Sequence, residues 1–180
     1  MDQAAELARL TGLKGAFGKA MDYDGGEYGQ AVLTRHRIIA TNIHRLPGDG
    51  EPRIAFAVEI EAGGEPIHFV TVHLDHRSDS GRIEQARTLV KTFSDVKGPV
   101  ILAGDFNDVP GSDALSVFQA PWRWIAKEDP VLTHPAGRPR VEIDHVFVRG
   151  LQPVGKAVVP PEAVASDHRP VTAVVERPVP

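Results

Sequence analysis

The sequence ILAGDFNDVPGS, residues 101–112, joins a short apolar run to a turn rich in polar side chains. Residues 100–103 are continuously apolar and follow a proline, which is typical of a strand buried on both faces of a sheet. Asp105 and Asn107 come directly after that run. Polar chemistry therefore begins where a core strand is expected to end, at an edge of the sheet.

Downstream of this strand the chain loses its regular pattern before strands return. Ser112 is expected to cap a short helix that ends at Phe118. The several prolines of residues 122–139 indicate an irregular loop. Further strands are expected at residues 142–149, 156–159 and 170–176.

Upstream of it the chain shows a helix and a series of strands. Residues 80–96 carry apolar side chains at helical spacing, which indicates a surface helix that covers the sheet. The polar face of that helix is expected to hold Arg82, Glu84, Arg87 and Lys91. Strands are expected at residues 28–35, 38–46, 53–61 and 66–74, the last three as an antiparallel meander. Asp2 is expected to cap a short helix that Gly12 ends.

Composition is that of one domain, over residues 1–180, with 42% apolar residues and no strong bulk charge. A net charge of -4 gives no positive field for nucleic acid or an anionic membrane, so a polyanionic substrate must be held locally. The absence of cysteine excludes disulfides and thiolate metal sites. Neither a signal peptide nor a membrane-spanning stretch is recognised. We expect a soluble protein, cytoplasmic as expressed, without stable membrane association.

Four polar clusters stand at the ends of predicted strands or just after them. They are HLDH at residues 73–76, GDFND at 104–108, IDH at 143–145 and SDH at 166–168. A single Asp-His pair is more often a surface ion pair than a functional site. Four clusters on one rim of a rigid scaffold are a common way to position catalytic groups.

The residue types in these clusters suit the hydrolysis of phosphate esters. Asp105, Asn107 and Asp167 offer the hard oxygen ligands that Mg²⁺ or Mn²⁺ prefers. A hard cation bound there would neutralise the charge of a phosphate, which is one requirement of phosphoester hydrolysis.

Imidazole groups meet a second requirement of this chemistry. His73 and His168 can donate hydrogen bonds to phosphate oxygens or transfer protons near neutral pH. Asp144 can fix the tautomer and orientation of one of them, as a carboxylate does in a catalytic triad.

Taken in order, the motifs resemble those of a known family. The runs VTVHLDH (70–76), ILAGDFNDVPGS (101–112), EIDHVFV (142–148) and ASDHRPV (165–171) are similar to motifs of the endonuclease/exonuclease/phosphatase family. The GDFN and SDHRP motifs together are highly specific, and YDGGEYGQAVLTRHRI (23–38) extends the resemblance toward the N-terminus. The resemblance implies a DNase I-like four-layered α/β sandwich of two mainly antiparallel sheets with outer helices.

The resemblance also implies a role for each acidic or amide side chain of the motifs. Asp105 and Asn107 would position the nucleophilic water, the metal and the phosphate. Asp167 would be a further ligand of the Mg²⁺ or Mn²⁺ cofactor.

For the histidines, the resemblance implies contacts with the phosphate. His168 would touch the phosphate or transfer a proton, oriented by Asp144, while His73 would flank the phosphate from the opposite side. Glu27 is expected to orient His73, on a looser match. The expected catalytic residues are His73, Asp105, Asn107, Asp144, Asp167 and His168, of which His73, Asn107 and His168 also bind the substrate.

The chain departs from the family pattern at its N-terminus. Family members begin with a strand that ends in asparagine, then a strand whose Gln-Glu pair supplies a metal ligand, and neither segment is present here. We therefore expect an N-terminally incomplete domain whose activity is reduced by the missing ligand. Because open sheet faces are usually covered, we also expect a homo-oligomer, with a second copy over the gap.

The expected function is divalent-metal-dependent hydrolysis of phosphate esters, with a phosphodiesterase or nuclease that cleaves DNA or related phosphodiesters as the first hypothesis. A phosphatase or sphingomyelinase-like phospholipase of the same family is an alternative that a panel of substrates would separate. A catalytically impaired scaffold that self-associates is another alternative, and weak metal affinity would indicate it.

Overall fold

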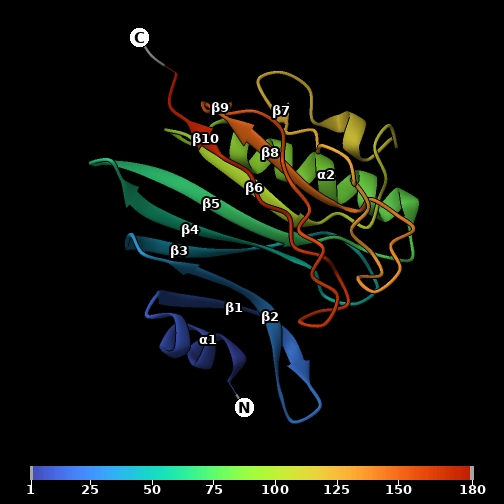
Figure 1. Cartoon of the computed structure of the whole chain (residues 1–180), viewed down its shortest axis with the longest axis horizontal. Coiled ribbons are helices and arrows are strands. Elements are labelled where there is room, and N and C mark those ends of the chain that lie inside the picture. The colour runs from blue at the N-terminus through green and yellow to red at the C-terminus, as the bar shows by residue number, and fades with distance from the viewer. Residues whose placement is uncertain (1, 179–180) are drawn as a thin grey trace.

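A computed structural model describes residues 2–178, and Figure 1 shows their helices and strands in chain order. The helices are α1 (Gln3–Thr11) and α2 (Asp79–Ser94), with one 3₁₀ turn, η1 (Leu115–Val117). The strands before α2 are β1 (Lys14–Tyr23), β2 (Gly26–Thr34), β3 (Arg37–Arg45), β4 (Ile54–Ala62) and β5 (Glu65–His73). The strands after α2 are β6 (Val100–Asp105), β7 (Arg123–Trp124), β8 (Asp144–Arg149), β9 (Gln152–Pro153) and β10 (Val175–Glu176).

The main sheet has six strands in the order β3-β4-β5-β6-β8-β7. The expected antiparallel meander of β3, β4 and β5 is confirmed. β6 pairs with β5 in parallel, because α2 carries the chain back along the sheet between the two strands. β8 runs antiparallel to β6, so the ends of β5 and β6 and the start of β8 share one edge.

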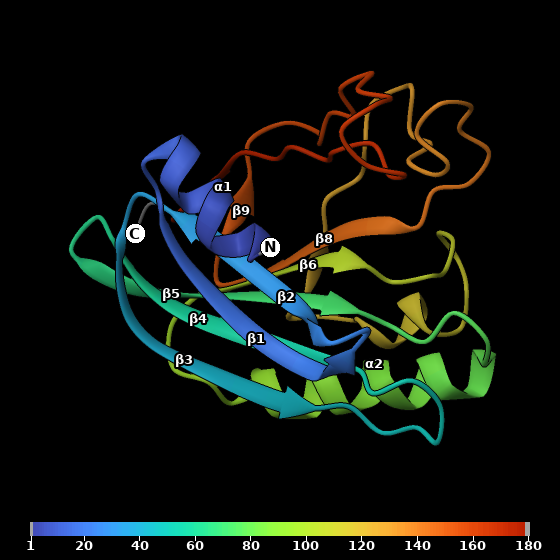
Figure 2. The ribbon, with the colours of Figure 1, turned by 90° about the horizontal axis from the view of Figure 1, so that it is seen from below.

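Helix α2 covers one face of this sheet (Figure 2). The Ser78 hydroxyl caps the helix by accepting a hydrogen bond from the Gly81 N–H at 3.0 Å. The apolar stripe of α2 packs into a buried cluster shared with β4, β5, β6 and β8. The placement of Arg82 on the solvent face was wrong. Arg82 is buried, because its guanidinium donates to the Asp75 carbonyl and the Asp108 carboxylate, both at 3.1 Å.

Two strand pairs cover the opposite face of the main sheet. The β1–β2 pair packs Ala20 and Val32 against Phe56 of β4. The β9–β10 pair packs Val175 in a second cluster with Val148 of β8. Because α1 lies outside β1–β2, four layers follow one another: α1, the strand pairs, the main sheet and α2 (Figure 2). The expected DNase I-like four-layered α/β sandwich, mainly antiparallel, is confirmed.

The strand pairs leave the middle of their face only half covered. Phe69 and Ile101 are partly buried there, whereas Val100 and Leu102 on the α2 side are fully buried. A groove of about 330 Å³ runs between β2 and the sheet, with Ile60 and Phe69 in its lining. The expectation that β6 is buried on both faces was therefore wrong for the face that carries Ile101.

Strand β1 has no counterpart among the predicted elements. Its sequence KGAFGKAMDY contains Gly, Ala, Lys and Asp, which are uncommon in strands and hide the alternation of its buried residues. Glycine is nevertheless required at position 18, because a Cβ there would lie 2.4 Å from the Phe56 ring. Tertiary packing decides this strand, and a local pattern cannot show it.

The predicted elements at the two ends of the chain differ in how well they match. Asp2 and Gly12 cap α1 as expected, although no side chain of that helix is buried. The strand expected at 170–176 is reduced to β10, and residues 156–159 contribute only isolated bridges. The helix expected after Ser112 is the single 3₁₀ turn η1, and the irregular loop at 122–139 includes the two-residue β7. Neither helix described in residues 2–178 has the length and apolar character needed to span a bilayer.

Candidate active site

Three of the predicted site residues form a row across one edge of the main sheet. His73 ends β5, Asp105 ends β6, and Asp144 begins β8. The strand register pairs His73 with Asp105 and Asp105 with Asp144. Residues that pair directly in a sheet project to the same face. The sheet itself therefore brings together three side chains that are far apart in the sequence.

Gly104 permits the close pairing of β5 and β6 at this edge. Its φ is 147°, and a Cβ at this position would lie 2.0 Å from the Val72 carbonyl oxygen. Only glycine fits there without moving the backbone. This contact accounts for the glycine that precedes Asp105 in the GDFN motif.

His73 lies between Asp105 and Tyr28. Its Nε2 is 3.6 Å from Asp105 Oδ2, and its Nδ1 contacts the Tyr28 hydroxyl at 3.0 Å. Burial, and then the charge of Arg53, lower the pKa of His73 to about 4, so the ring is neutral near pH 7. With the Tyr28 hydroxyl donating to Nδ1, the ring proton is on Nε2 and faces Asp105.

The expected contact between Glu27 and His73 was wrong. Glu27 instead pairs with Lys19 of the neighbouring strand at 3.0 Å, because successive residues of β2 point to opposite faces. Tyr28, one residue further on, takes the place beside His73. Counting alternate residues back from Val32, which is buried, would have indicated Tyr28 from the sequence.

His168 approaches the Asp105 carboxylate from the loop between β9 and β10. Its Nδ1 contacts Asp144 Oδ2 at 2.9 Å, and its Nε2 is 3.9 Å from Asp105 Oδ2. Burial favours the neutral ring, but the hydrogen bond to Asp144 and its charge outweigh burial and raise the pKa of His168. Asp144 therefore lies where it can hold the Nδ1 proton and orient the ring, and its charge favours the protonated form.

The Asp105 carboxylate lies partly buried between these two rings. Its Oδ1 accepts a hydrogen bond from the Asn107 backbone N–H at 2.7 Å. Burial raises the pKa of Asp105, and the charge of Asp144 adds to this effect, while the Asn107 N–H opposes it. The Asn107 side chain donates from Nδ2 to the Leu74 carbonyl at 2.9 Å, which directs its Oδ1 away from Leu74.

Buried polar side chains fix the turn that follows β6. Arg82 donates to the Asp108 carboxylate at 3.1 Å, and His145 Nε2 donates to the Asp108 carbonyl at 2.9 Å. Burial, and then the charge of Lys127, lower the pKa of His145 to about 4. His145 is thus a neutral, buried support, in agreement with its predicted structural role.

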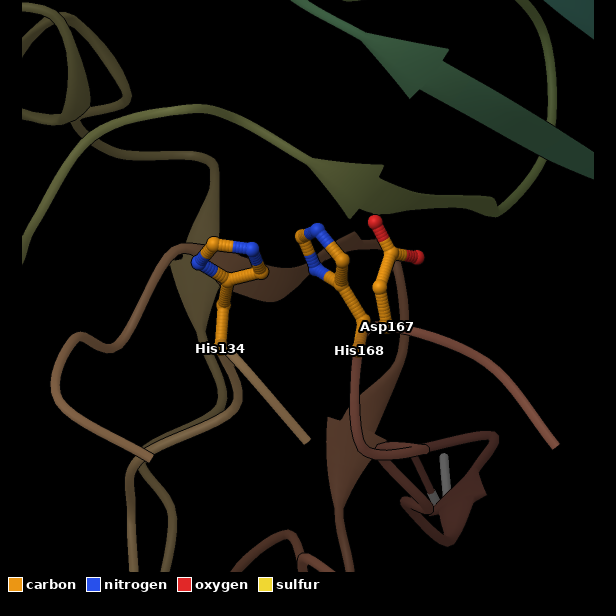
Figure 3. A group of neighbouring side chains, drawn as sticks. All are labelled: His134, Asp167 and His168. Carbon is orange, nitrogen blue, oxygen red and sulfur yellow. The ribbon is translucent and has the colours of Figure 1, made fainter. Parts of the chain in front are cut away.

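His134, which sequence analysis did not single out, lies beside His168. The two rings have centroids 4.5 Å apart and are tilted by 42°. Figure 3 shows His134 and Asp167 on opposite sides of the His168 ring. One donor atom from each of these three residues lies within 4.8 Å of the other two. No sequence pattern indicates His134, because it belongs to the irregular loop between β7 and β8.

A family model confirms the resemblance. The model for the "Endonuclease/Exonuclease/phosphatase family" matches residues 2–168, which include all six predicted site residues. The chain belongs to the endonuclease/exonuclease/phosphatase family. The uncharacterized protein YbhP of Escherichia coli K12 is 30% identical over 170 residues, which cover 88% of this chain and 66% of YbhP. The chain thus spans just under two thirds of the length of this relative.

Solved structures share the fold of this family member. The mannosyl-6-phosphatase Bt3783 of Bacteroides thetaiotaomicron VPI-5482 has a TM-score of 0.79 and 20% identity, over 97% of this chain and 81% of that chain. D. rerio TDP2, complexed with a single strand DNA product, has a TM-score of 0.76 and 16% identity, over 96% and 81%. At these identities the likeness concerns the fold alone.

Enzymes of this family generally depend on a divalent metal, and the donors of the site fit a hard cation. Carboxylate oxygens of Asp105 and Asp167 and the amide oxygen of Asn107 are the ligand types that Mg²⁺ and Mn²⁺ prefer. Burial raises the pKa of Asp105 and so disfavours its ionised form, and a cation beside the carboxylate would offset that effect. Asp105, Asn107 and Asp167 stay the predicted ligands of such an ion, although in the described residues Asp167 groups with His134 and His168.

Proposed function

We propose that the protein is a divalent-metal-dependent hydrolase of phosphate esters, and more narrowly a phosphodiesterase that cleaves DNA or related phosphodiesters. The observation that carries this proposal is one partly buried carboxylate, that of Asp105, held between two imidazoles. Asp105 Oδ2 lies 3.6 Å from Nε2 of His73 and 3.9 Å from Nε2 of His168. A phosphate oxygen bound at this edge of the main sheet lies near two hydrogen-bond donors, one on each side of the Asp105 carboxylate.

Asp105 acts as the base for the attacking water. Its Oδ2 faces both imidazoles, so the carboxylate can accept the proton of a water directed at phosphorus. The water oxygen bonds to phosphorus, and the ester P–O bond breaks with its electrons on the leaving oxygen. A bound hard cation would supply charge neutralisation for the phosphate.

The two histidines that bind the phosphate have different groups behind their rings. His168 donates through Nε2–H, and Asp144, 2.9 Å from its Nδ1, favours the protonated form of the ring. His73 donates through Nε2–H as a neutral ring that the Tyr28 hydroxyl orients at 3.0 Å. Donors fixed in place before the reaction stabilise the charge that develops on phosphate in the transition state.

A phosphatase is the second candidate, because the mannosyl-6-phosphatase named above shares the fold at a TM-score of 0.79. The TDP2 structure with its single strand DNA product shares it at 0.76 and supports the nuclease. A monoesterase and a diesterase use the same carboxylate and histidines, so the substrate distinguishes them. Plasmid DNA and bis(p-nitrophenyl) phosphate test the diesterase, and p-nitrophenyl phosphate and mannose 6-phosphate test the phosphatase.

The deciding experiment measures these four activities with Mg²⁺, Mn²⁺ or EDTA. We expect metal-dependent cleavage of the diesters that His168→Ala abolishes and that the control His36→Ala retains. His36 is a suitable control because it lies between β2 and β3, outside the site. Monoester cleavage alone would favour the phosphatase. Absence of every activity in all metals would refute the proposed function and support the impaired scaffold.

A further inference from the structure

His134 is a site histidine to which the proposed reaction gives no role. Its backbone is fixed by the loop, because its N–H donates to the Val141 carbonyl at 3.2 Å and its carbonyl accepts from Arg140 N–H at 2.8 Å. In residues 2–178 no side-chain hydrogen bond to protein holds its ring. A rigid backbone thus presents an imidazole with its nitrogens available for a ligand.

The loop of His134 is tied directly to the loop that carries Asp167 and His168. The Ala136 N–H donates to the Asp167 carbonyl at 2.7 Å, and the Arg169 N–H donates to the Thr133 carbonyl at 2.7 Å. The residues that make these two bonds lie on either side of His134 in one loop and on either side of His168 in the other. The proximity of the two rings is therefore fixed by backbone pairing and does not depend on side-chain packing alone.

We propose that His134, Asp167 and His168 bind one divalent cation of the borderline class, such as Zn²⁺. Two imidazole nitrogens and one carboxylate oxygen are a donor set that suits Zn²⁺ better than Mg²⁺. The three donor atoms already lie within 4.8 Å of one another. Around a tetrahedral ion, bond lengths of about 2.1 Å require donor atoms about 3.4 Å apart. Side-chain rotations that move the donor atoms by about 1 Å therefore complete the site.

The environment of His168 is that of a metal-binding histidine. Its Nδ1 contacts the Asp144 carboxylate at 2.9 Å, which leaves Nε2 as the ligand atom. Metal-bound histidines usually have such a carboxylate or carbonyl behind the distal nitrogen, which fixes the tautomer. Asp167 is exposed, so a cation can reach the site from solvent and keep an open coordination position.

This site makes Zn²⁺ an inhibitor, a consequence that rests on the proposed function. His168 Nε2 cannot bind a cation and donate to a phosphate oxygen at the same time. Asp167 is also a predicted ligand of the hard cation, together with Asp105 and Asn107. Occupancy by Zn²⁺ therefore removes both the His168 donor and one ligand of the activating metal.

The binding test uses tag-free protein stripped with EDTA, because a polyhistidine tag would itself bind metal. Calorimetric titration with Zn²⁺, and visible absorption with Co²⁺ as its spectroscopic substitute, are compared for wild type, His134→Phe and Asp167→Asn. Phenylalanine keeps an aromatic ring against His168 and removes the donor. We expect one equivalent bound by wild type and at least about 10-fold weaker binding by each variant, since even second-shell changes cost that much.

Two matched variants locate the site. His36→Phe, away from the site, should bind as wild type does, and so should His73→Phe, on the other side of Asp105. Wild-type affinity in His134→Phe, or loss of binding in His73→Phe instead, would overturn the proposal. Thermal unfolding of each variant without metal checks that the fold is intact.

An activity arm separates this inference from the proposed function. The ratio of Mg²⁺-dependent diester cleavage with and without Zn²⁺ is measured within each variant. We expect Zn²⁺ to inhibit wild type and to inhibit His134→Phe at least about 10-fold more weakly. Equal inhibition of both proteins would refute the inhibitory role. If no protein cleaves any phosphate ester, the proposed function fails, while calorimetry still decides the metal site.

Discussion

The two histidines of the site face the same carboxylate oxygen but have different partners behind them. His73, on the sheet side, contacts the Tyr28 hydroxyl, and burial lowers its pKa to about 4. His168, on the loop side, contacts the Asp144 carboxylate, which outweighs burial and raises its pKa. The sheet side therefore presents a neutral imidazole, whereas the loop side favours the protonated form of its imidazole.

The difference shows that burial sets the charge of His73, which has no carboxylate hydrogen-bonded to its ring in residues 2–178, whereas the Asp144 carboxylate outweighs burial at His168. A second imidazolium beside Asp105 would be repelled by the first, and the charge of His168 indeed contributes to the lowered pKa of His73. One neutral and one charged ring allow two donors to bind a phosphate at a lower electrostatic cost. If the two sides differ in this way, substitutions on the loop side and on the sheet side should have unequal effects on activity.

Removing each ring in turn should show the largest difference between the sides. We expect His168→Ala to lower kcat for diester cleavage by about 10³ to 10⁴, because it removes a charged donor that also transfers protons. His73→Ala should lower kcat by about 10², because it removes one neutral donor. Steady-state kinetics with Mg²⁺ measures both, with His36→Ala as control. Equal losses in the two variants would contradict the assignment of different charges.

Replacing the partner on the loop side should make His168 resemble His73. Asp144→Asn removes the negative charge that raises the pKa of His168, so we expect this pKa to fall and kcat to drop by about 10². NMR titration of the imidazole signals in EDTA-treated protein measures the pKa without interference from a metal. An unchanged His168 pKa would show that Asp144 does not set the charge.

Sequence reasoning found the row of His73, Asp105 and Asp144 because each residue directly follows or opens an apolar strand. The motif residues lie at the strand ends, and the strand register then places their side chains next to one another. His134 could not be found this way, because its place beside His168 depends on backbone pairing between two irregular loops. Long-range pairing of that kind leaves no periodic signal in the sequence.

The elements of the fold also divide into those that a sequence pattern predicts and those that it does not. The face covered by α2 followed from helical spacing and from the meander, whereas β1 was missed because the packing of Gly18 on Phe56 requires small residues. The predicted self-association over the half-covered face, beside Phe69 and Ile101, stays a prediction.

Histidines kept neutral by burial should make the fold sensitive to acid. The pKa of His145 is about 4 in the folded protein and about 6.5 unfolded, so between these values only the unfolded chain binds a proton there. The free energy of unfolding should therefore fall as pH decreases through this window, by about 3 kcal/mol from His145 alone.

Urea denaturation at several pH values, with His145→Phe and the control His36→Phe, isolates this contribution. The expected readout is a smaller loss of stability with acid in His145→Phe, whatever its stability at neutral pH. A slope as steep as that of wild type would show that His145 is protonated in the folded protein.

Of the four predicted effects, that of replacing Tyr28, the partner of His73 on the sheet side, should be the smallest. Tyr28→Phe keeps the ring and removes only the hydroxyl that contacts His73 Nδ1 at 3.0 Å. One hydrogen bond between neutral groups contributes about 1 kcal/mol, so we expect kcat to fall about 5-fold. Because burial is the main cause of the lowered pKa of His73, its NMR titration should still lie well below that of a free histidine. A loss as large as that of Asp144→Asn would mean that Tyr28 does more than orient a neutral ring, and the contrast between the two sides of the site would not hold.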